Sequence, residues 1–148
     1  MKCTPQRGFT LVEVMTAVAI MAIITAIAFP IYQSQSRKGK RPDGIALVEM
    51  VAQAEQHFFT ALIDRQLPGT FTTAIAVDLL PYGITAAVSH GGYYNIAVAP
   101  GDTGVITSSF VVTATAVGNQ ANDDCKVFMY YSSGRRDGLP DRQTCWGK

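Results

Sequence analysis

The N-terminal part of the sequence has almost no charge. From Phe9 to Ile31 the one formally charged side chain is Glu13, and no glycine occurs between Phe9 and Phe29. A helix needs roughly 20 apolar residues to cross a bilayer, and this stretch is slightly longer. A carboxylate inside such a span is costly and marks a functional position, so we expect Glu13 to have a specific partner.

The sequence is also poor in residues that build catalytic or metal sites. It has two histidines and three cysteines, without a Cys-x-x-Cys motif, which excludes a recognisable redox motif or zinc knuckle. We find no nucleophile beside a base, no carboxylate pair and no cluster of metal ligands, so we predict no enzymatic activity and no cofactor. His57 is interpreted as a partly buried structural residue, and His90 as a turn residue.

A short basic leader, residues 1–8, precedes the apolar stretch and ends at Gly8. The motif Phe9-Thr10-Leu11-Val12-Glu13 follows it directly. In this arrangement the chain resembles the type IV pilins. The resemblance implies that a prepilin peptidase cuts between Gly8 and Phe9, and that the new α-amine of Phe9 is methylated. It also implies that Glu13 pairs with the Phe9 amine of a neighbouring subunit during assembly.

An ordinary secretory signal is a second interpretation of the same residues. Its basic region would be the leader, its apolar region Leu11–Thr25 and its cleavage site Ala26-Ile27-Ala28, so that the mature chain begins at Phe29. The apolar stretch continues through Ile31, however, and it contains Glu13, which is unusual in a signal. We therefore favour the pilin interpretation.

Three segments follow from the pilin interpretation. Residues 1–8 are the leader, residues 9–41 form an apolar helix for the membrane and the filament core, and residues 42–148 form a globular pilin domain. The implied partners are other pilin subunits, the prepilin peptidase, the inner-membrane pilus assembly machinery and, before assembly, the lipid bilayer. The expected location is the bacterial inner membrane and then a cell-surface pilus, with the globular domain periplasmic or extracellular.

Four basic residues follow the apolar stretch, namely Arg37, Lys38, Lys40 and Arg41. The positive-inside rule would place this cluster in the cytoplasm, whereas the pilin resemblance places it on the opposite side of the membrane. We follow the resemblance and expect a solvated collar on the filament, which could touch lipid headgroups before extraction.

The long helix is expected to be interrupted twice. Pro30 lacks the N–H that the helical ladder needs, so it should kink or loosen the helix. A second kink or brief unwinding is expected near Pro42, with Asp43 as the N-cap of the next helical segment. From about Ile45 to Ile63 an apolar stripe with three-and-four spacing should pack against a sheet. The stripe comprises Leu47, Met50, Val51, Ala54, Phe58, Ala61 and Leu62.

Beyond residue 66 the pattern changes to turns and alternating apolar residues. Residues 66–92 are irregular, and strands are predicted at 93–99, 106–117 and 125–131. Residues 133–143 are interpreted as a polar loop and 144–146 as a short fourth strand. Two sets of alternating residues should share the inner face: Tyr94, Ile96 and Val98, and Phe110, Val112, Ala114 and Ala116.

The predicted fold class is therefore α+β. The resemblance implies the type IV pilin fold, with a long N-terminal helix packed on a small antiparallel β-sheet and a C-terminal disulfide loop. A cut after Gly8 removes Cys3 and leaves Cys125 and Cys145, which can pair outside the cytoplasm. Such a loop would contribute roughly 3 kcal/mol in the chain-entropy treatment. Two buried free thiols are the alternative.

The C-terminal part narrows the resemblance to the PilE/ComP-like group of minor pilins. The matching pieces are Tyr93–Ile96, Phe110–Thr115, Asp124-Cys125, Gly134 and Cys145-Trp146. The resemblance implies a structural subunit, and specifically a minor pilin, that assembles into a type IV pilus or primes it. Such a fimbrial subunit supports adhesion, twitching motility or DNA uptake.

A DNA receptor is the first alternative function, because some members of this group bind DNA in the region between the two cysteines. The candidate residues are Lys126, Arg135, Arg136 and Arg142, with Lys148 beyond them. Basic side chains beside aromatic rings can hold phosphates and stack bases. Acidic residues interrupt this cluster, and the net formal charge of the chain is only +1, so a solvated loop is the simpler interpretation.

Two further alternatives have less support. A secretion-system pseudopilin would share the N-terminal motif, but the cysteine pair and the final Cys145-Trp146 argue against it. A membrane-tethered enzyme would need a catalytic constellation that the sequence does not offer.

Overall fold

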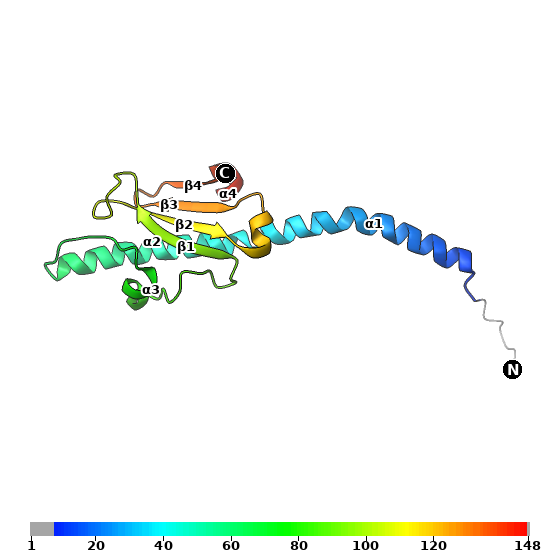
Figure 1. The fold of residues 1–148 in the computed structure, drawn as a ribbon, viewed down its shortest axis with the longest axis horizontal. Coiled ribbons are helices and arrows are strands. Elements are labelled where there is room, and N and C mark those ends of the chain that lie inside the picture. The colour runs from blue at the N-terminus through cyan, green and yellow to red at the C-terminus, as the bar shows by residue number, and fades with distance from the viewer. Residues whose placement is uncertain (1–7, 148) are drawn as a thin grey trace, which may run out of the picture. The chain divides into compact units, whose positions relative to one another are not determined.

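A computed structural model describes residues 8–147. The helices are α1 (Leu11–Lys38), α2 (Arg41–Asp64), α3 (Ile75–Asp78) and α4 (Arg142–Trp146). The strands are β1 (Tyr94–Pro100), β2 (Phe110–Ala116), β3 (Val127–Tyr131) and β4 (Arg136–Leu139), and short 3-10 turns cover Leu80–Tyr82 and Gly118–Asn122. This order of a long helical region and a four-stranded antiparallel sheet confirms the predicted fold class (Figure 1). The chain divides between Ser36 and Arg37 into two compact units, which are described separately.

Most of α1 lies in the first unit, and none of its residues is buried. The helix satisfies its own polar groups: Thr16 Oγ1 donates to the carbonyl of Glu13 at 2.9 Å, and Thr25 Oγ1 donates to that of Met21 at 2.8 Å. Such internal bonding suits an apolar environment, where water cannot serve as a partner. The helix continues through Pro30, so the proline does not end it, and its predicted loosening remains a prediction.

The helical backbone is interrupted at Gly39 and Lys40, just before Pro42. Pro42 itself lies in the first turn of α2, where its missing N–H costs no helical bond. Lys40 is the N-cap residue, and its side chain makes no capping bond. Asp43 as N-cap is therefore wrong; its carboxylate accepts the Gly91 N–H at 3.3 Å instead.

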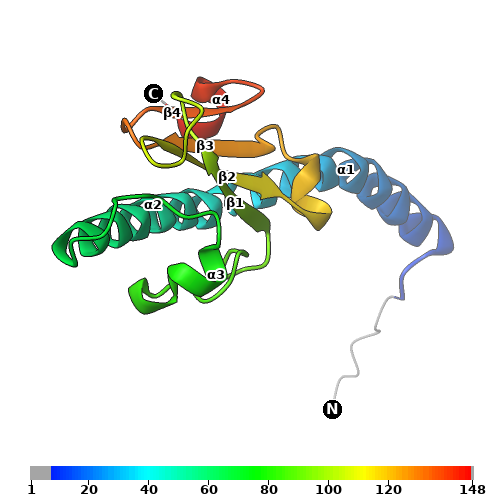
Figure 2. The same cartoon turned by 60° about the vertical axis from the view of Figure 1, so that its left-hand side comes forward.

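In the second unit, α2 packs against the sheet, whose strands follow the order β1-β2-β3-β4 (Figures 1 and 2). Every neighbouring pair of strands is antiparallel. The two predicted sets of alternating residues are confirmed as core, since all seven are buried. Gly44 lets α2 approach β1 closely, because a Cβ at this position would lie 2.9 Å from the Tyr94 ring.

The buried face of α2 differs from the predicted stripe. Val51 and Ala54 are buried as expected, but Met50 is 52% exposed. The other buried residues of α2 are Gly44, Val48, Ala52 and Glu55. The apolar pattern missed Gly44, Ala52 and Glu55 because small residues and a carboxylate give little apolar signal, and it also omitted Val48. His57 is exposed and stacks on Tyr82 with ring centroids 6.2 Å apart, so its predicted partial burial is also wrong.

The C-terminal segment contains more structure than predicted. Residues 133–143 are not simply a loop, since they include β4, which pairs with β3 from Tyr130 opposite Arg136 to Val127 opposite Leu139. The predicted strand at 144–146 is wrong, because these residues belong to α4. Residues 66–92 also hold a helix, α3, and a 3-10 turn. β2 and β3 both begin later than predicted, because turns or extended connections precede them.

Candidate functional site

Glu13 lies in the first turn of α1 and is bonded to Thr10. The backbone N–H and the hydroxyl of Thr10 both donate to Glu13 Oε2 at 2.9 Å, and the Glu13 N–H donates to Thr10 Oγ1 at 3.3 Å. This reciprocal arrangement is a capping box. The carboxylate therefore has a partner in its own chain, which the sequence analysis missed although Thr-x-x-Glu is the signature of such a box.

The apolar side chains around Glu13 are open to their surroundings. Phe9 is 88% exposed, and it lies with Gly8 in non-helical backbone just before α1. The helical region from Leu11 onward includes a stretch that is long and apolar enough to cross a membrane, and no part of that stretch is buried. Residues 1–7 of the leader lie outside the described residues. The N-terminal end of α1 thus offers one carboxylate within an uncovered apolar surface.

The disulfide joins Cys125, just before β3, to Cys145 in α4, which confirms the expected pairing. Gly138 on β4 makes room for it, because a Cβ there would lie 2.7 Å from Cys145 Sγ. Trp146 completes this corner by donating its Nε1–H to the carbonyl of Asp137 at 2.6 Å. The bond satisfies one carbonyl of the edge strand β4, so α4 protects an edge that would otherwise be open to other strands.

The two arginines of the β3–β4 hairpin are engaged by acidic partners. Arg135 binds Asp102 at 2.6 Å and Asp137 at 3.3 Å, and its guanidinium lies 3.5 Å from the centre of the Tyr131 ring. Arg136 binds Glu49 of α2 at 2.8 Å. Two of these carboxylates, on Asp102 and Glu49, are distant in sequence, so the sequence alone does not show that they pair with the arginines. The local positive charge is smaller than the sequence indicates.

Lys126 lies just before β3, at the other end of the hairpin, and Arg142 is the first residue of α4. Both are exposed, and neither makes an ion pair with any residue in the range 8–147. Lys126 follows Cys125 and donates its backbone N–H to the carbonyl of Leu139 at 3.0 Å, whereas Arg136 is near the hairpin turn. About four residues of strand separate these positions, or about 13 Å. Lys126 therefore lies apart from the two arginines at the hairpin turn, and Arg142 belongs to a separate element, α4.

Arg41 does not belong to the predicted solvated collar. Its side chain is 15% exposed; its Nε binds Asp123 at 2.6 Å, and its Nη1 donates to the carbonyl of Thr144 at 2.9 Å. The buried carboxylate of Asp123 also accepts the Cys125 N–H at 2.9 Å. Arg41 thus ties the start of α2 to the disulfide region. Of the other three basic residues, Arg37 and Lys38 lie in the last turn of α1 and Lys40 is the N-cap of α2.

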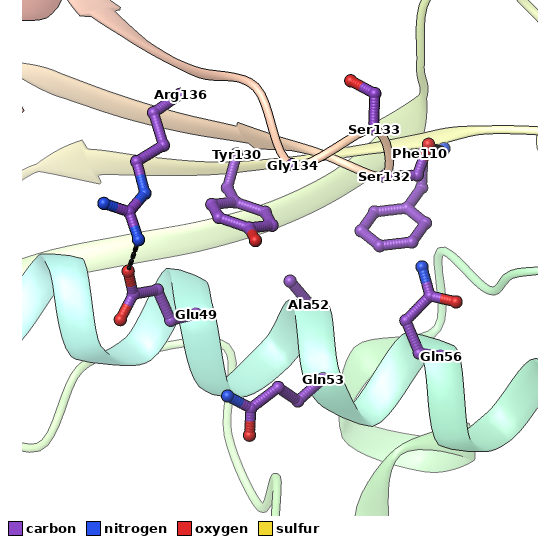
Figure 3. A pocket seen from close by; sticks show the side chains of 10 residues that line it. All are labelled: Glu49, Ala52, Gln53, Gln56, Phe110, Tyr130, Ser132, Ser133, Gly134 and Arg136. Atoms are coloured by element: carbon purple, nitrogen blue, oxygen red, sulfur yellow. Dashed lines mark hydrogen bonds and ion pairs between the residues drawn. The ribbon is translucent and has the colours of Figure 1, made fainter.

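A polar groove lies between α2 and the β3–β4 turn, with a volume of about 490 Å³ (Figure 3). The ion pair between Glu49 and Arg136 crosses one end, and the Tyr130 ring stands above Ala52 (Figure 3). Amide and hydroxyl side chains line the rest, namely Gln53, Gln56, Ser132 and Ser133. The groove brings together no nucleophile with a base. Within the described residues no group of three or more His, Cys, Asp or Glu could hold a metal ion.

The comparisons with known proteins agree with this architecture. The family described as "Type IV minor pilin ComP, DNA uptake sequence receptor" matches residues 30–129, and the prokaryotic N-terminal methylation motif matches residues 3–29. The first match alone covers more than half of the chain.

Individual relatives are fimbrial proteins. A fimbrial protein of Neisseria meningitidis serogroup A is 28% identical over 123 residues, which cover 83% of this chain and 62% of that protein. The fimbrial protein EcpC of Eikenella corrodens is 33% identical over 117 residues, covering 78% of this chain and 69% of EcpC. A second meningococcal fimbrial protein, of serogroup B, is 35% identical over 71 residues, which cover 41% of its length.

A shorter match comes from another organism. Prepilin peptidase-dependent protein D of Escherichia coli is 50% identical over 38 residues, which cover 26% of each chain. Pilin membership implies a structural and not an enzymatic protein, with an N-terminal apolar helix that fits membrane anchoring and a pilus. The long helix, the antiparallel sheet, the Cys125–Cys145 disulfide and the family matches together establish that this chain belongs to the ComP family of type IV minor pilins.

Proposed function

We propose that this chain is a structural subunit of a type IV pilus, a minor pilin that assembles into the filament or primes it. The observation that carries the proposal is the contrast between α1, which buries no residue, and the second unit, which has a core of its own. An apolar helix of this length needs a cover, which a bilayer supplies before assembly and neighbouring helices supply afterwards. Residues 9–41 are then the membrane and filament segment, and residues 42–148 the displayed domain.

Processing is part of the same proposal. A prepilin peptidase removes residues 1–8 by cutting between Gly8 and Phe9, and the amine of Phe9 is methylated. The two residues support this step, because they lie outside α1 in exposed non-helical backbone. The mature subunit resides in the bacterial inner membrane until the pilus assembly machinery transfers it to the filament, where its second unit faces the cell exterior.

Glu13 directs docking in this proposal. In the free chain its Oε2 is held by Thr10, and a filament core of apolar helices would leave the carboxylate without a counter-charge. The Phe9 amine of a neighbouring subunit supplies that charge. Leaving a charge uncompensated in an apolar interior is strongly unfavourable, so this pairing would select the correct axial position of each incoming subunit.

Intact mass measurement and N-terminal sequencing of membrane-extracted protein test the processing. The expected chain begins at Phe9 and carries one methyl group on its amine. A chain that begins at Phe29 would establish the secretory-signal interpretation and overturn the proposal, because the apolar helix would then be absent from the mature protein.

A second candidate function is DNA reception, favoured by the description of the matching family as a DNA uptake sequence receptor. In this chain the contacts would come from Lys126, Arg135, Arg136 and Arg142. Because Arg135 and Arg136 already bind carboxylates, we expect weak binding in which few phosphates are neutralised. Each phosphate contact contributes about −0.9 to the slope of log affinity against log salt, so this slope should be shallow.

The test is binding of a labelled DNA duplex to the full chain in detergent micelles at two salt concentrations. Changing Arg135, Arg136 and Arg142 together to Ala should weaken the binding. The control Arg65→Ala, an exposed arginine just after α2, should leave it unchanged. Sequence-selective binding that persists at physiological salt and disappears in the triple variant would make DNA reception the primary function. Equal losses in the control would exclude the hairpin as the contact surface.

A further inference from the structure

A buried carboxyl group on α2 has no role in the proposed assembly or DNA contact. Glu55 is fully buried, and its Oε2 accepts the backbone N–H of Thr72 at 2.9 Å. Its Oε1 is also buried and has no hydrogen-bond partner among the described residues. A buried polar atom without a partner is uncommon in native proteins and calls for an explanation.

Thr72 connects this carboxyl group to a second one. The Thr72 hydroxyl donates to Asp78 Oδ2 in α3 and accepts the Ala74 N–H at 2.9 Å. One threonine therefore bridges Glu55 on α2 and Asp78 on the segment that comes after α2. Apolar residues hold the same segment, since Phe71, Ile75 and Leu79 are all buried in the core. The docking of residues 70–80 onto α2 thus combines an apolar contact with two acidic side chains that are both hydrogen-bonded to Thr72.

The surroundings of Glu55 favour its neutral form. Burial is the largest effect and raises the pKa of Glu55 to about 7, the Thr72 N–H opposes this rise, and the charge of Asp78 adds to it. The ion pairs of the described residues involve neither Glu55 nor Asp78. Asp78 is the charged group that the docked segment brings near Glu55. The strands β1, β2 and β3 and the 3-10 turn Leu80–Tyr82 also pack on α2. The titratable groups that they bring to this face are the phenols of Tyr94, Tyr130 and Tyr82.

We propose that Glu55 is a proton-operated latch, which holds residues 70–80 on α2 when it is neutral and releases them when it ionises. Ionisation strengthens the bond from Thr72, but a hydrogen bond to a charged group contributes only about 1.5–3 kcal/mol. The unpaired charge on Oε1 costs several kcal/mol while it stays out of water. Opening the segment lets water reach Oε1 and moves Asp78 away, so release is favourable once the proton is lost.

The latch does not depend on the proposed function. The released segment carries Val77 and Leu80, which are already 73% and 52% exposed. Its opening would change the surface that the second unit presents in solution, whether or not the chain enters a filament.

Hydrogen exchange followed by mass spectrometry tests the latch in the full chain in detergent micelles between pH 5.5 and 8.5. Exchange times are scaled for the pH dependence of the chemical step. We expect protection of residues 70–80 to fall by up to about tenfold for each pH unit as the pH rises towards about 7, the pKa of Glu55 in the closed form, and then to level off. Protection of β2, measured in the same samples, should stay well above that of residues 70–80 at every pH, because β2 exchanges only when the whole core opens. Unchanged protection of residues 70–80 across this range would overturn the proposal.

Two variants and a control assign the effect to Glu55. Glu55→Gln should remove the pH dependence, whereas Glu49→Gln, which alters the exposed acidic group paired with Arg136, should retain it. Asp78→Asn removes the neighbouring like charge, so the carboxyl group of Glu55 should ionise more readily. The loss of protection should therefore begin at a lower pH than in the wild type. This variant keeps the test decisive if Glu55→Gln fails to fold. A pH dependence that survives in Glu55→Gln, or a loss of protection that does not begin at a lower pH in Asp78→Asn, would contradict the latch.

Discussion

The two long helices of this pilin differ in how they are covered. No residue of α1 is buried, and apolar side chains such as Ile24 are about as exposed as surface residues, at 60%. On α2, by contrast, Val48 and Val51 are completely buried against the sheet. The second unit is therefore stabilised by its own core, whereas α1 depends on a cover that the single chain does not provide. The same side-chain chemistry supports folding in α2 and, in the function that we propose, association in α1.

Matched phenylalanine substitutions should give the largest contrast between the two regions. Phe128 is completely buried and packs on Tyr94 and Trp146, so Phe128→Ala should lower the free energy of unfolding by about 3–5 kcal/mol. Phe29 on α1 is 58% exposed, and Phe29→Ala should change the unfolding of the second unit by less than about 0.5 kcal/mol. Urea unfolding of the full chain in micelles measures both. Similar losses would show that α1 contributes to the same core.

Two arginines allow the same comparison for charge. Arg41 neutralises the buried Asp123, and Arg41→Ala should lower the unfolding free energy by about 3–5 kcal/mol because it leaves that carboxylate unpaired. Arg135 is 44% exposed and pairs with exposed acidic residues, so Arg135→Ala should cost at most about 1 kcal/mol. Thermal and urea unfolding rank the two variants. The reverse order would mean that the Arg41 pair does not hold α2 to the disulfide region.

The disulfide should stabilise the second unit and leave α1 unaffected. Replacing Cys125 and Cys145 together by Ser should lower the unfolding free energy of this unit by about 3 kcal/mol, mainly because the unfolded chain gains conformational freedom. The helicity of α1 in micelles, measured by circular dichroism after subtraction of the second unit's contribution, should stay the same. An unchanged unfolding midpoint in the double variant would argue against this role.

Glu55 should make the stability of the second unit dependent on pH. Its pKa is raised from 4.5 in the unfolded chain to about 7 in the folded protein. The unfolded chain therefore loses this proton first, and stability should fall as pH rises from about 4.5 to 7 and then level off. The free energy of unfolding should fall by at most about 3 kcal/mol. Release of residues 70–80 would make this decrease smaller. Comparing the unfolding free energy of wild type and Glu55→Gln at each pH isolates this effect. Parallel plots of unfolding free energy against pH for the two proteins would contradict it.

The predictable features are those with local periodicity. The helix α1 and the inner faces of β1 and β2 were predicted correctly, because an apolar run and an alternation of residues can be recognised from neighbouring positions alone. β4 was missed because its sequence, Arg-Asp-Gly-Leu, has no strand pattern. Its conformation depends on pairing with β3 and on the covering helix α4.

The candidate site was predicted less completely for a related reason. Arg41 meets Asp123, and Arg136 meets Glu49, across 82 and 87 residues of sequence. Residue type alone indicated a basic collar and a basic hairpin, and it could not reveal which of these charges the fold would neutralise. Glu55 was overlooked because a charged residue is rarely fully buried. Only the docking of residues 70–80 explains its position.

Filament incorporation tests most directly whether α1 is covered by assembly through Glu13. The amount of the chain in sheared filaments, relative to the membrane pool, is compared for wild type, Glu13→Ala, Glu13→Gln and the control Thr25→Ala. Glu13→Gln keeps an acceptor for the Thr10 capping bonds but removes the charge, so it separates helix capping from docking. We predict that both Glu13 variants are cut and inserted but largely fail to enter filaments, whereas Thr25→Ala enters normally. Incorporation of Glu13→Ala at the wild-type level would contradict the central claim.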